Sequence, residues 1–127
     1  MSGCNDLILL EYGWGCRPGD GTGMTDCFQL VCEVRRRLGL TDYAPEFGWA
    51  YRTYSEETFP RIRLIRWLME RCNRTTEPAP GDVVLFGGAT AMGAVTAERG
   101  AIFLAGGRRV AHLPVVPSTV NLFRPRL

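Results

Sequence analysis

The clearest periodic pattern in the chain lies between positions 27 and 38. Its apolar residues recur at intervals of three and four, as on one face of a helix: Cys27, Leu30, Val31, Val34 and Leu38. Thr25 or Asp26 is a candidate N-cap, and Gly39 is a candidate C-terminal cap. The pattern therefore predicts a helix that turns one face to a core and carries Cys27 on its first turn.

The rest of the N-terminal part contains one more strong helical pattern. It starts after Pro60, and its apolar residues alternate with arginines: Ile62, Ile65, Leu68, Met69 and Cys72. We expect a short helix at residues 5–11. We expect a loop at residues 12–23, because glycine and proline are frequent there. Residues 41–59 are aromatic but have no clean period, so we expect an irregular lobe with one short helix.

The C-terminal part changes to short apolar runs after the turn-forming residues 75–80. These runs predict four strands, with Gly106 and Gly107 as a hairpin turn: residues 83–86, 100–105, 109–113 and 119–123. Helices followed by strands predict an α+β domain, with N-terminal helices packed on a C-terminal antiparallel sheet or small barrel. The 127 residues fit a single domain, 1–127, with a helical half at 1–75 and a β-meander half at 76–127.

Composition narrows the classes of partner. Hydrophobic residues make up 46% and charged residues 22%, and no run approaches the roughly 18 apolar residues of a membrane span. Residues 1–10 lack the basic start and long apolar core of a signal peptide. A net charge of +2 is too small to indicate a nucleic-acid partner. All the basic residues other than the histidine are arginines, the cation most common at protein interfaces, which favours assembly with other proteins.

The cysteines do not predict a cofactor. Five are present and no two form a Cys-x-x-Cys pair: Cys4, Cys16, Cys27, Cys32 and Cys72. An odd number without such spacing is typical of reduced thiols in a protein made inside a cell. The spacing gives no support to a metal or iron–sulfur site, so we expect neither a metal nor another cofactor.

Four short segments, in order, resemble motifs of one family. They are Tyr-Gly-Trp-Gly at 12–15, Asp-Cys-Phe-Gln-Leu-Val at 26–31, Gly-Asp-Val-Val-Leu-Phe at 81–86 and Ala-Ile-Phe-Leu-Ala-Gly-Gly at 101–107. Together they resemble the NlpC-type cysteine peptidases, papain-like enzymes that cleave bacterial cell-wall peptides. The resemblance covers nearly the whole chain. Phe28 and Gln29 after the cysteine, and the compact length, resemble the branch found in the tails of bacteriophages.

The resemblance implies a papain-like fold with Cys27 as nucleophile. In the family, the catalytic histidine lies two residues before the hairpin segment, and a third polar residue lies twelve positions further on. Here these positions are Arg99 and Ala111, and an alternative register puts Ala91 at the histidine position. His112, the single histidine, falls one residue beyond the third position, which on a strand faces the other side unless a bulge intervenes.

Arg99 does not replace a histidine. A guanidinium stabilises a thiolate but stays protonated, so it cannot shuttle the proton that acyl transfer requires. The resemblance, with the histidine missing, therefore implies that the chain is a structural protein of the virion. We expect it to be made in the host cytoplasm and to lie at the tail tip, baseplate or hub. Its expected partners are other tail proteins and copies of itself, and its peptidase activity is lost or vestigial.

Two further hypotheses use the same residues. One is an active peptidoglycan endopeptidase that opens the wall during infection, with Cys27 as nucleophile and His112 as base. The other is a non-catalytic module that binds peptidoglycan peptides in the old groove, where Tyr12, Trp14 and Asp26 are the candidate binding residues.

Each candidate residue also has a purely structural interpretation. Cys27 is then a small packing residue, His112 a hydrogen-bonded strand residue and Asp26 a helix cap. Trp14 either lines a groove or anchors the loop to the core.

Overall fold

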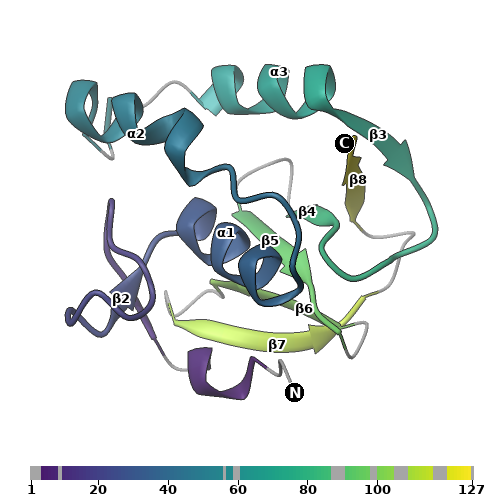
Figure 1. The fold of residues 1–127 in the computed structure, drawn as a ribbon, viewed down its shortest axis with the longest axis horizontal. Coiled ribbons are helices and arrows are strands. Elements are labelled where there is room, and N and C mark those ends of the chain that lie inside the picture. Colours follow the sequence, from purple (N-terminus) through teal and green to yellow (C-terminus); the bar gives the residue numbers. More distant parts are fainter. Residues whose placement is uncertain are drawn as a thin grey trace.

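The computed structural model describes residues 4–8, 10–55, 57–58, 61–86, 91–97, 100–104, 109–115 and 120–126. Three helices and a six-stranded antiparallel sheet make up most of the fold, which confirms the α+β class (Figure 1). In chain order the elements are η1 (Asn5–Leu7), β1 (Glu11–Tyr12), β2 (Met24–Thr25), α1 (Cys27–Arg37), α2 (Ala44–Thr53), α3 (Arg61–Arg71), β3 (Cys72–Thr75), β4 (Val83–Phe86), β5 (Ala91–Val95), β6 (Gly100–Leu104), β7 (Val110–Pro114) and β8 (Asn121–Pro125).

The strand order of the sheet is β3-β8-β4-β5-β6-β7. Strands β4 to β7 form a meander that includes β5, a strand that the sequence does not predict, and β8 does not continue it. Instead, Phe123 and Leu122 of β8 pair with Val83 and Val84 of β4, on the side away from β5. The expected meander is therefore wrong for the last strand, because the two buried residues of β8 complete the sheet beside β4. Within the described part of the chain the sheet is open, with β3 and β7 at its edges.

Helix α1 forms as the periodicity predicts. Three apolar residues of its predicted face are buried to 97% or more: Leu30, Val31 and Val34. Of the two candidate caps, Asp26 is the N-cap, and its carboxylate accepts from the Gln29 amide at 2.7 Å. Gly39 follows the helix with φ +73°, the left-handed conformation that glycine adopts most easily.

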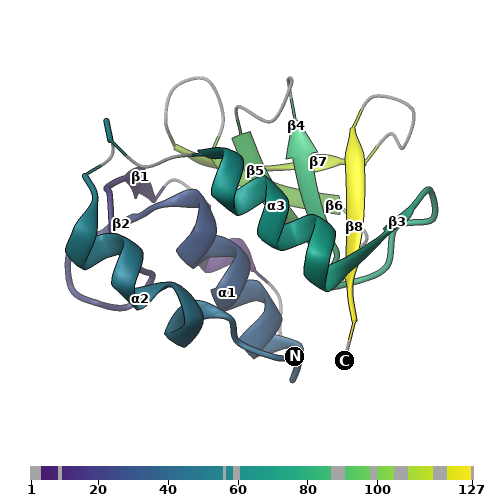
Figure 2. The same cartoon turned by 90° about the horizontal axis from the view of Figure 1, so that it is seen from above.

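The helices lie over one face of the sheet (Figures 1 and 2). Helix α1 packs mainly on β5, and α3 packs on β8. The helices meet through aromatic rings, because Trp67 of α3 lies edge-on to Phe28 of α1 at 6.4 Å and to Tyr43 at 4.8 Å. A second apolar cluster on the sheet includes Val84 and Val95, which are both fully buried.

Three parts of the fold differ from the sequence predictions. The one helix expected within residues 41–59 is present, but it is a regular ten-residue helix at 44–53 and occupies much of the expected irregular lobe, because the Asp42 carboxylate accepts from the Ala44 amide and Pro45 suits a first turn. Residue 72 begins strand β3 and does not extend the helix, since residues 72–75 pair with β8. Among the described residues of 5–11, the single turn η1 is the only helical part, and strand β1 begins at Glu11, so Tyr12 lies in a strand and not in the loop.

Strand β5 was considered only as an alternative register of the family motif. Its sequence, Ala-Met-Gly-Ala-Val, contains little that favours a strand by itself. It forms because it pairs with β4 on one side and β6 on the other. The predicted turn at Gly106 and Gly107 lies outside the described residues.

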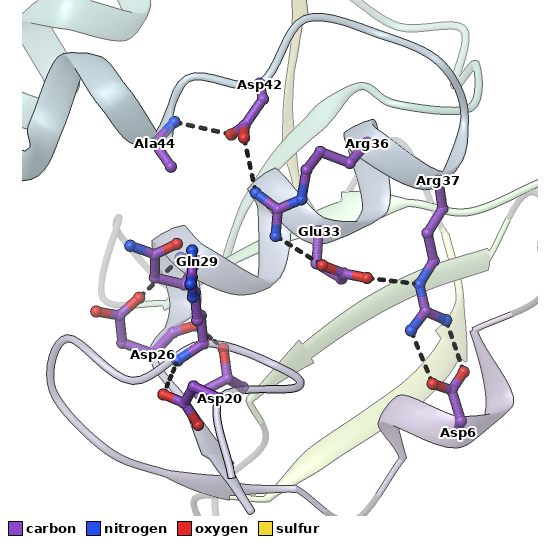
Figure 3. Close-up of polar contacts among 11 residues, drawn as sticks. Asp6, Asp20, Asp26, Gln29, Glu33, Arg36, Arg37, Asp42 and Ala44 are labelled. Carbon is purple, nitrogen blue, oxygen red and sulfur yellow. Dashed lines mark hydrogen bonds and ion pairs between the residues drawn. The ribbon is translucent and has the colours of Figure 1, made fainter. Parts of the chain in front are cut away.

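An ion-pair network ties the N-terminal segment to α1 (Figure 3). Glu33 accepts from both Arg36 and Arg37, at 2.6 and 2.8 Å. Arg37 also binds both carboxylate oxygens of Asp6 in η1, and Arg36 binds Asp42 before α2. Through Arg37 and Arg36, Glu33 of α1 is thus connected to η1 and to the segment before α2.

In the described part of the chain, every helix is too short or too polar to span a lipid bilayer.

Candidate functional site

The N-terminus of α1 is organised by Asp26. Its two carboxylate oxygens accept from the backbone amides of Gln29, at 2.7 Å, and of Gly15, at 2.9 Å. The Tyr51 hydroxyl donates a third hydrogen bond to the same carboxylate. Asp26 therefore joins the glycine-rich loop, α1 and α2, and Figure 3 shows it beside the first turn of α1.

Burial is the main influence on the Asp26 carboxyl group. The residue is only 2% exposed, and this desolvation raises its pKa, while the hydrogen bonds from Gln29, Tyr51 and Gly15 partly oppose the shift. Tyr51 responds in the same direction, since burial and then the neighbouring Asp26 charge raise its pKa. The Tyr51 hydroxyl is thus a hydrogen-bond donor and not a base at neutral pH.

Trp14 packs against the same tyrosine. The two rings meet edge to face, with centroids 5.0 Å apart. Gly15 lies close to the ring as well, because a Cβ there would be 3.4 Å from the nearest Tyr51 atom. Trp14 therefore anchors the loop to α2. Tyr12 is half-buried in β1, where it pairs with Thr25 just before the Asp26 cap.

Cys27 is the first residue of α1 and is half-buried at the edge of the main core. The partial positive charge of a helix N-terminus favours a thiolate there, whereas the adjacent Asp26 carboxylate disfavours it when ionised.

His112 is held on β7 by Thr96. The Thr96 hydroxyl lies 3.1 Å from the Gly100 carbonyl, to which it donates, and 2.9 Å from His112 Nε2. His112 Nε2 is thus hydrogen-bonded to Thr96. The side chain also covers Gly100, where a Cβ would lie 2.6 Å from Nε2.

The structure does not bring His112 to Cys27. Arg35, in the later part of α1, donates to the Gly81 carbonyl at 2.9 Å, and the Gly81 amide donates to the Val95 carbonyl at 2.8 Å. The C-terminal part of α1 thus lies over the end of β5, next to Thr96. Cys27 begins the same helix, about 12 Å from Arg35 along the helix axis. Cys27 and the Thr96–His112 pair lie toward opposite ends of α1.

The other positions suggested by the family resemblance provide no imidazole. Arg99 lies outside the described residues. Ala111 pairs with Phe103, one residue away from the Ile102–His112 pair, so its side chain faces the other side of the sheet. Ala91 begins β5, the strand on which α1 packs, and pairs with Phe86.

Sequence reasoning missed Tyr51. The tyrosine lies within residues 41–59, where one short helix is expected but no apolar period gives its bounds, and no motif connects it with Asp26. The contact between Tyr51 and Asp26 depends on α2 packing beside α1 (Figure 2). Among the described residues, no group of three or more histidine, cysteine, aspartate or glutamate side chains could hold a metal ion.

Fold and site together define an α+β domain in which a half-buried cysteine begins the helix packed on an antiparallel sheet. No protein-family model, curated protein or solved structure matches this chain.

Proposed function

We propose that this chain is a non-catalytic structural subunit of a bacteriophage tail tip, baseplate or hub, built on an NlpC-type peptidase fold that has lost its catalytic base. One observation carries the catalytic part of this proposal. The single histidine is hydrogen-bonded to Thr96 at the far end of α1, while the candidate nucleophile Cys27 begins that helix. A cysteine hydrolase needs a base within hydrogen-bonding reach of its thiol.

The order of the strands also supports the loss of the base. In the family, the histidine strand follows the Gly-Asp-Leu-Val-Phe-Phe strand. The strand that follows the corresponding segment 81–86 here is β5, which also packs on α1. This favours the alternative register, in which the position of the histidine is occupied by Ala91. Alanine has no titratable group, so it cannot take the proton of a thiol.

The candidate binding residues have structural partners that fit a packing role. Asp26 caps α1, Trp14 lies against Tyr51, and Tyr12 pairs in β1. The tail assignment itself is an analogy drawn from the family branch, and the arginine-rich surface supports a role in assembly.

A digestion assay tests the catalytic part of the proposal. Purified protein is incubated with peptidoglycan fragments beside Cys27→Ser, and Cys16→Ser serves as the control for loss of a half-buried thiol. We expect no product that depends on Cys27. Cleavage by the wild type and by Cys16→Ser, but not by Cys27→Ser, would instead identify an active endopeptidase. For the tail assignment, antibodies to the chain should label the tails of purified virions and not their heads.

A further inference from the structure

A pocket between α2 and α3 belongs to none of the motifs discussed above. It is open to solvent, has a volume of about 340 Å³, and is lined by two tryptophans, three arginines and two glutamates. Trp49 and Glu46 come from α2, and the other lining residues come from α3. Figure 1 shows these two helices following one another along the top of the molecule, above α1.

Two of the arginines are held against the aromatic walls. The Arg63 guanidinium lies 4.8 Å from the centre of the Trp49 ring, and it donates to the Tyr54 hydroxyl at 3.1 Å. Arg71 lies 5.8 Å from the Trp67 ring and forms an ion pair with Glu46 at 3.0 Å. These contacts arrange guanidinium groups and flat apolar surfaces around one opening before any ligand binds.

Arg66 differs from the other two arginines. Its side chain is exposed, and within the described part of the chain it makes no hydrogen bond, ion pair or ring contact. Glu70, one turn later on α3, is the second carboxylate of the lining. With Glu46 matched by Arg71, the remaining groups are two arginines and one glutamate. The pocket therefore has a net positive charge.

The surface next to the pocket extends this charge. Arg126 reaches back from the end of β8 and donates to the Glu70 carbonyl at the end of α3. The complementary partner for such a surface is one that carries negative charge.

We propose that the α2–α3 pocket binds an acidic segment of a partner protein. A carboxylate of the partner would pair with Arg66 and Arg63, and an adjacent apolar side chain would lie on Trp49 and Trp67. Tryptophan and arginine together are typical of residues that dominate binding energy at protein interfaces. The two glutamates of the lining disfavour a continuous phosphate backbone, so a protein fits better than a nucleic acid. This inference rests on the proposed role in assembly and specifies where and with what chemistry the chain docks.

Tryptophan fluorescence can follow the binding directly, because two of the three tryptophans line the pocket. The probe is the capped peptide Ac-Glu-Glu-Leu-Glu-Glu-NH₂, and the control is the same peptide with lysine in place of glutamate. We expect a saturable change in emission with the glutamate peptide alone. Arg66→Ala should weaken this binding by about tenfold or more, because it removes a charged hydrogen-bond donor.

Two further variants control for charge and folding. Arg17→Ala removes an exposed arginine from the glycine-rich loop and should leave the affinity unchanged. Arg66→Glu should reverse the preference, so that the lysine peptide binds more tightly than the glutamate peptide. Three results would overturn the proposal: no saturable change up to millimolar peptide, equal affinity in Arg66→Ala and wild type, or tighter binding of a single-stranded oligonucleotide of the same charge.

Failure of this inference is distinguishable from failure of the proposed function. If the peptide does not bind and no peptidoglycan is cleaved, only the pocket assignment is wrong. If the peptide binds but Cys27-dependent cleavage occurs, only the loss of catalysis is wrong.

Discussion

At the scale of single residues, Asp26 and Cys27 are neighbours with different roles. The Asp26 carboxylate receives hydrogen bonds from three segments, so a structural role accounts for this residue and no catalytic role is needed. Cys27 keeps the position of a nucleophile on the first turn of α1. The sequence was sufficient to find both residues, because a cap before an amphipathic run has a strong local signal. The partner of His112 could not be found in this way, since Thr96 meets it only through the pairing of β6 with β7.

Glu33 provides a prediction about pH dependence. Its burial alone would raise its pKa, but the hydrogen bonds from Arg36 and Arg37 outweigh that effect and lower the pKa below its ordinary value of 4.5. A lowered pKa in the folded state contributes stability that is present above about pH 4.5 and is lost as the pH falls through the folded value. We expect Glu33→Gln to lower the free energy of unfolding by about 1 kcal/mol at pH 7, and by much less at pH 3.

Urea unfolding at the two pH values measures this difference. The control is Glu46→Gln, which breaks an ion pair with Arg71 in which both side chains are more than a third exposed. That change should cost less than about 0.5 kcal/mol at pH 7. An equal loss of stability for Glu33→Gln at pH 7 and pH 3 would contradict the assignment of the effect to the charged network.

At the scale of elements, the helices and strands that could be predicted are those whose own residues carry a clear pattern of apolar positions and caps. Helix α1 has an apolar stripe, an N-cap and a terminal glycine, and it forms at the expected residues. Strands β3 and β5 have no such pattern, and they exist because β8, β4 and β6 pair with them. Pairings of this kind join residues far apart in the chain, and no short window of sequence contains them.

Two glycines beside or within helices should respond to alanine in opposite ways. Gly39 has φ +73° and nothing within 4 Å of its Cβ position, so Gly39→Ala should cost about 1 kcal/mol through backbone strain alone. Gly48 lies inside α2, where a Cβ meets only the flexible end of Arg52 at 3.3 Å. Gly48→Ala should therefore stabilise the protein by about 0.5–1 kcal/mol.

Thermal unfolding of the two variants gives the comparison. Gly39→Ala should lower the midpoint temperature by a few degrees, and Gly48→Ala should raise it. A fall of similar size in both variants would mean that the positive φ of Gly39 is not the cause of its effect.

At the scale of the whole molecule, the helices cover one face of the sheet, and the candidate sites lie at different places on these helices. The cysteine end of α1 lies beside the glycine-rich loop and Tyr51, whereas His112 lies toward the opposite end of that helix. The arginine-rich pocket lies between α2 and α3. Sequence reasoning identified the residues at the cysteine end but not the pocket, because the pocket requires α2, whose aromatic residues show no clean period.

The central claim is that Cys27 and His112 do not act together. The most direct test is the alkylation rate of Cys27 as a function of pH, resolved from the other thiols by peptide mapping, in wild type and in His112→Ala. Cys32 and Cys72 are internal standards that should stay unreactive near neutral pH, because burial raises their pKa values to about 12 and about 11. We expect the Cys27 profiles of the two proteins to coincide. A profile that shifts to higher pH when His112 is removed would show an ion pair between the two residues and contradict the claim.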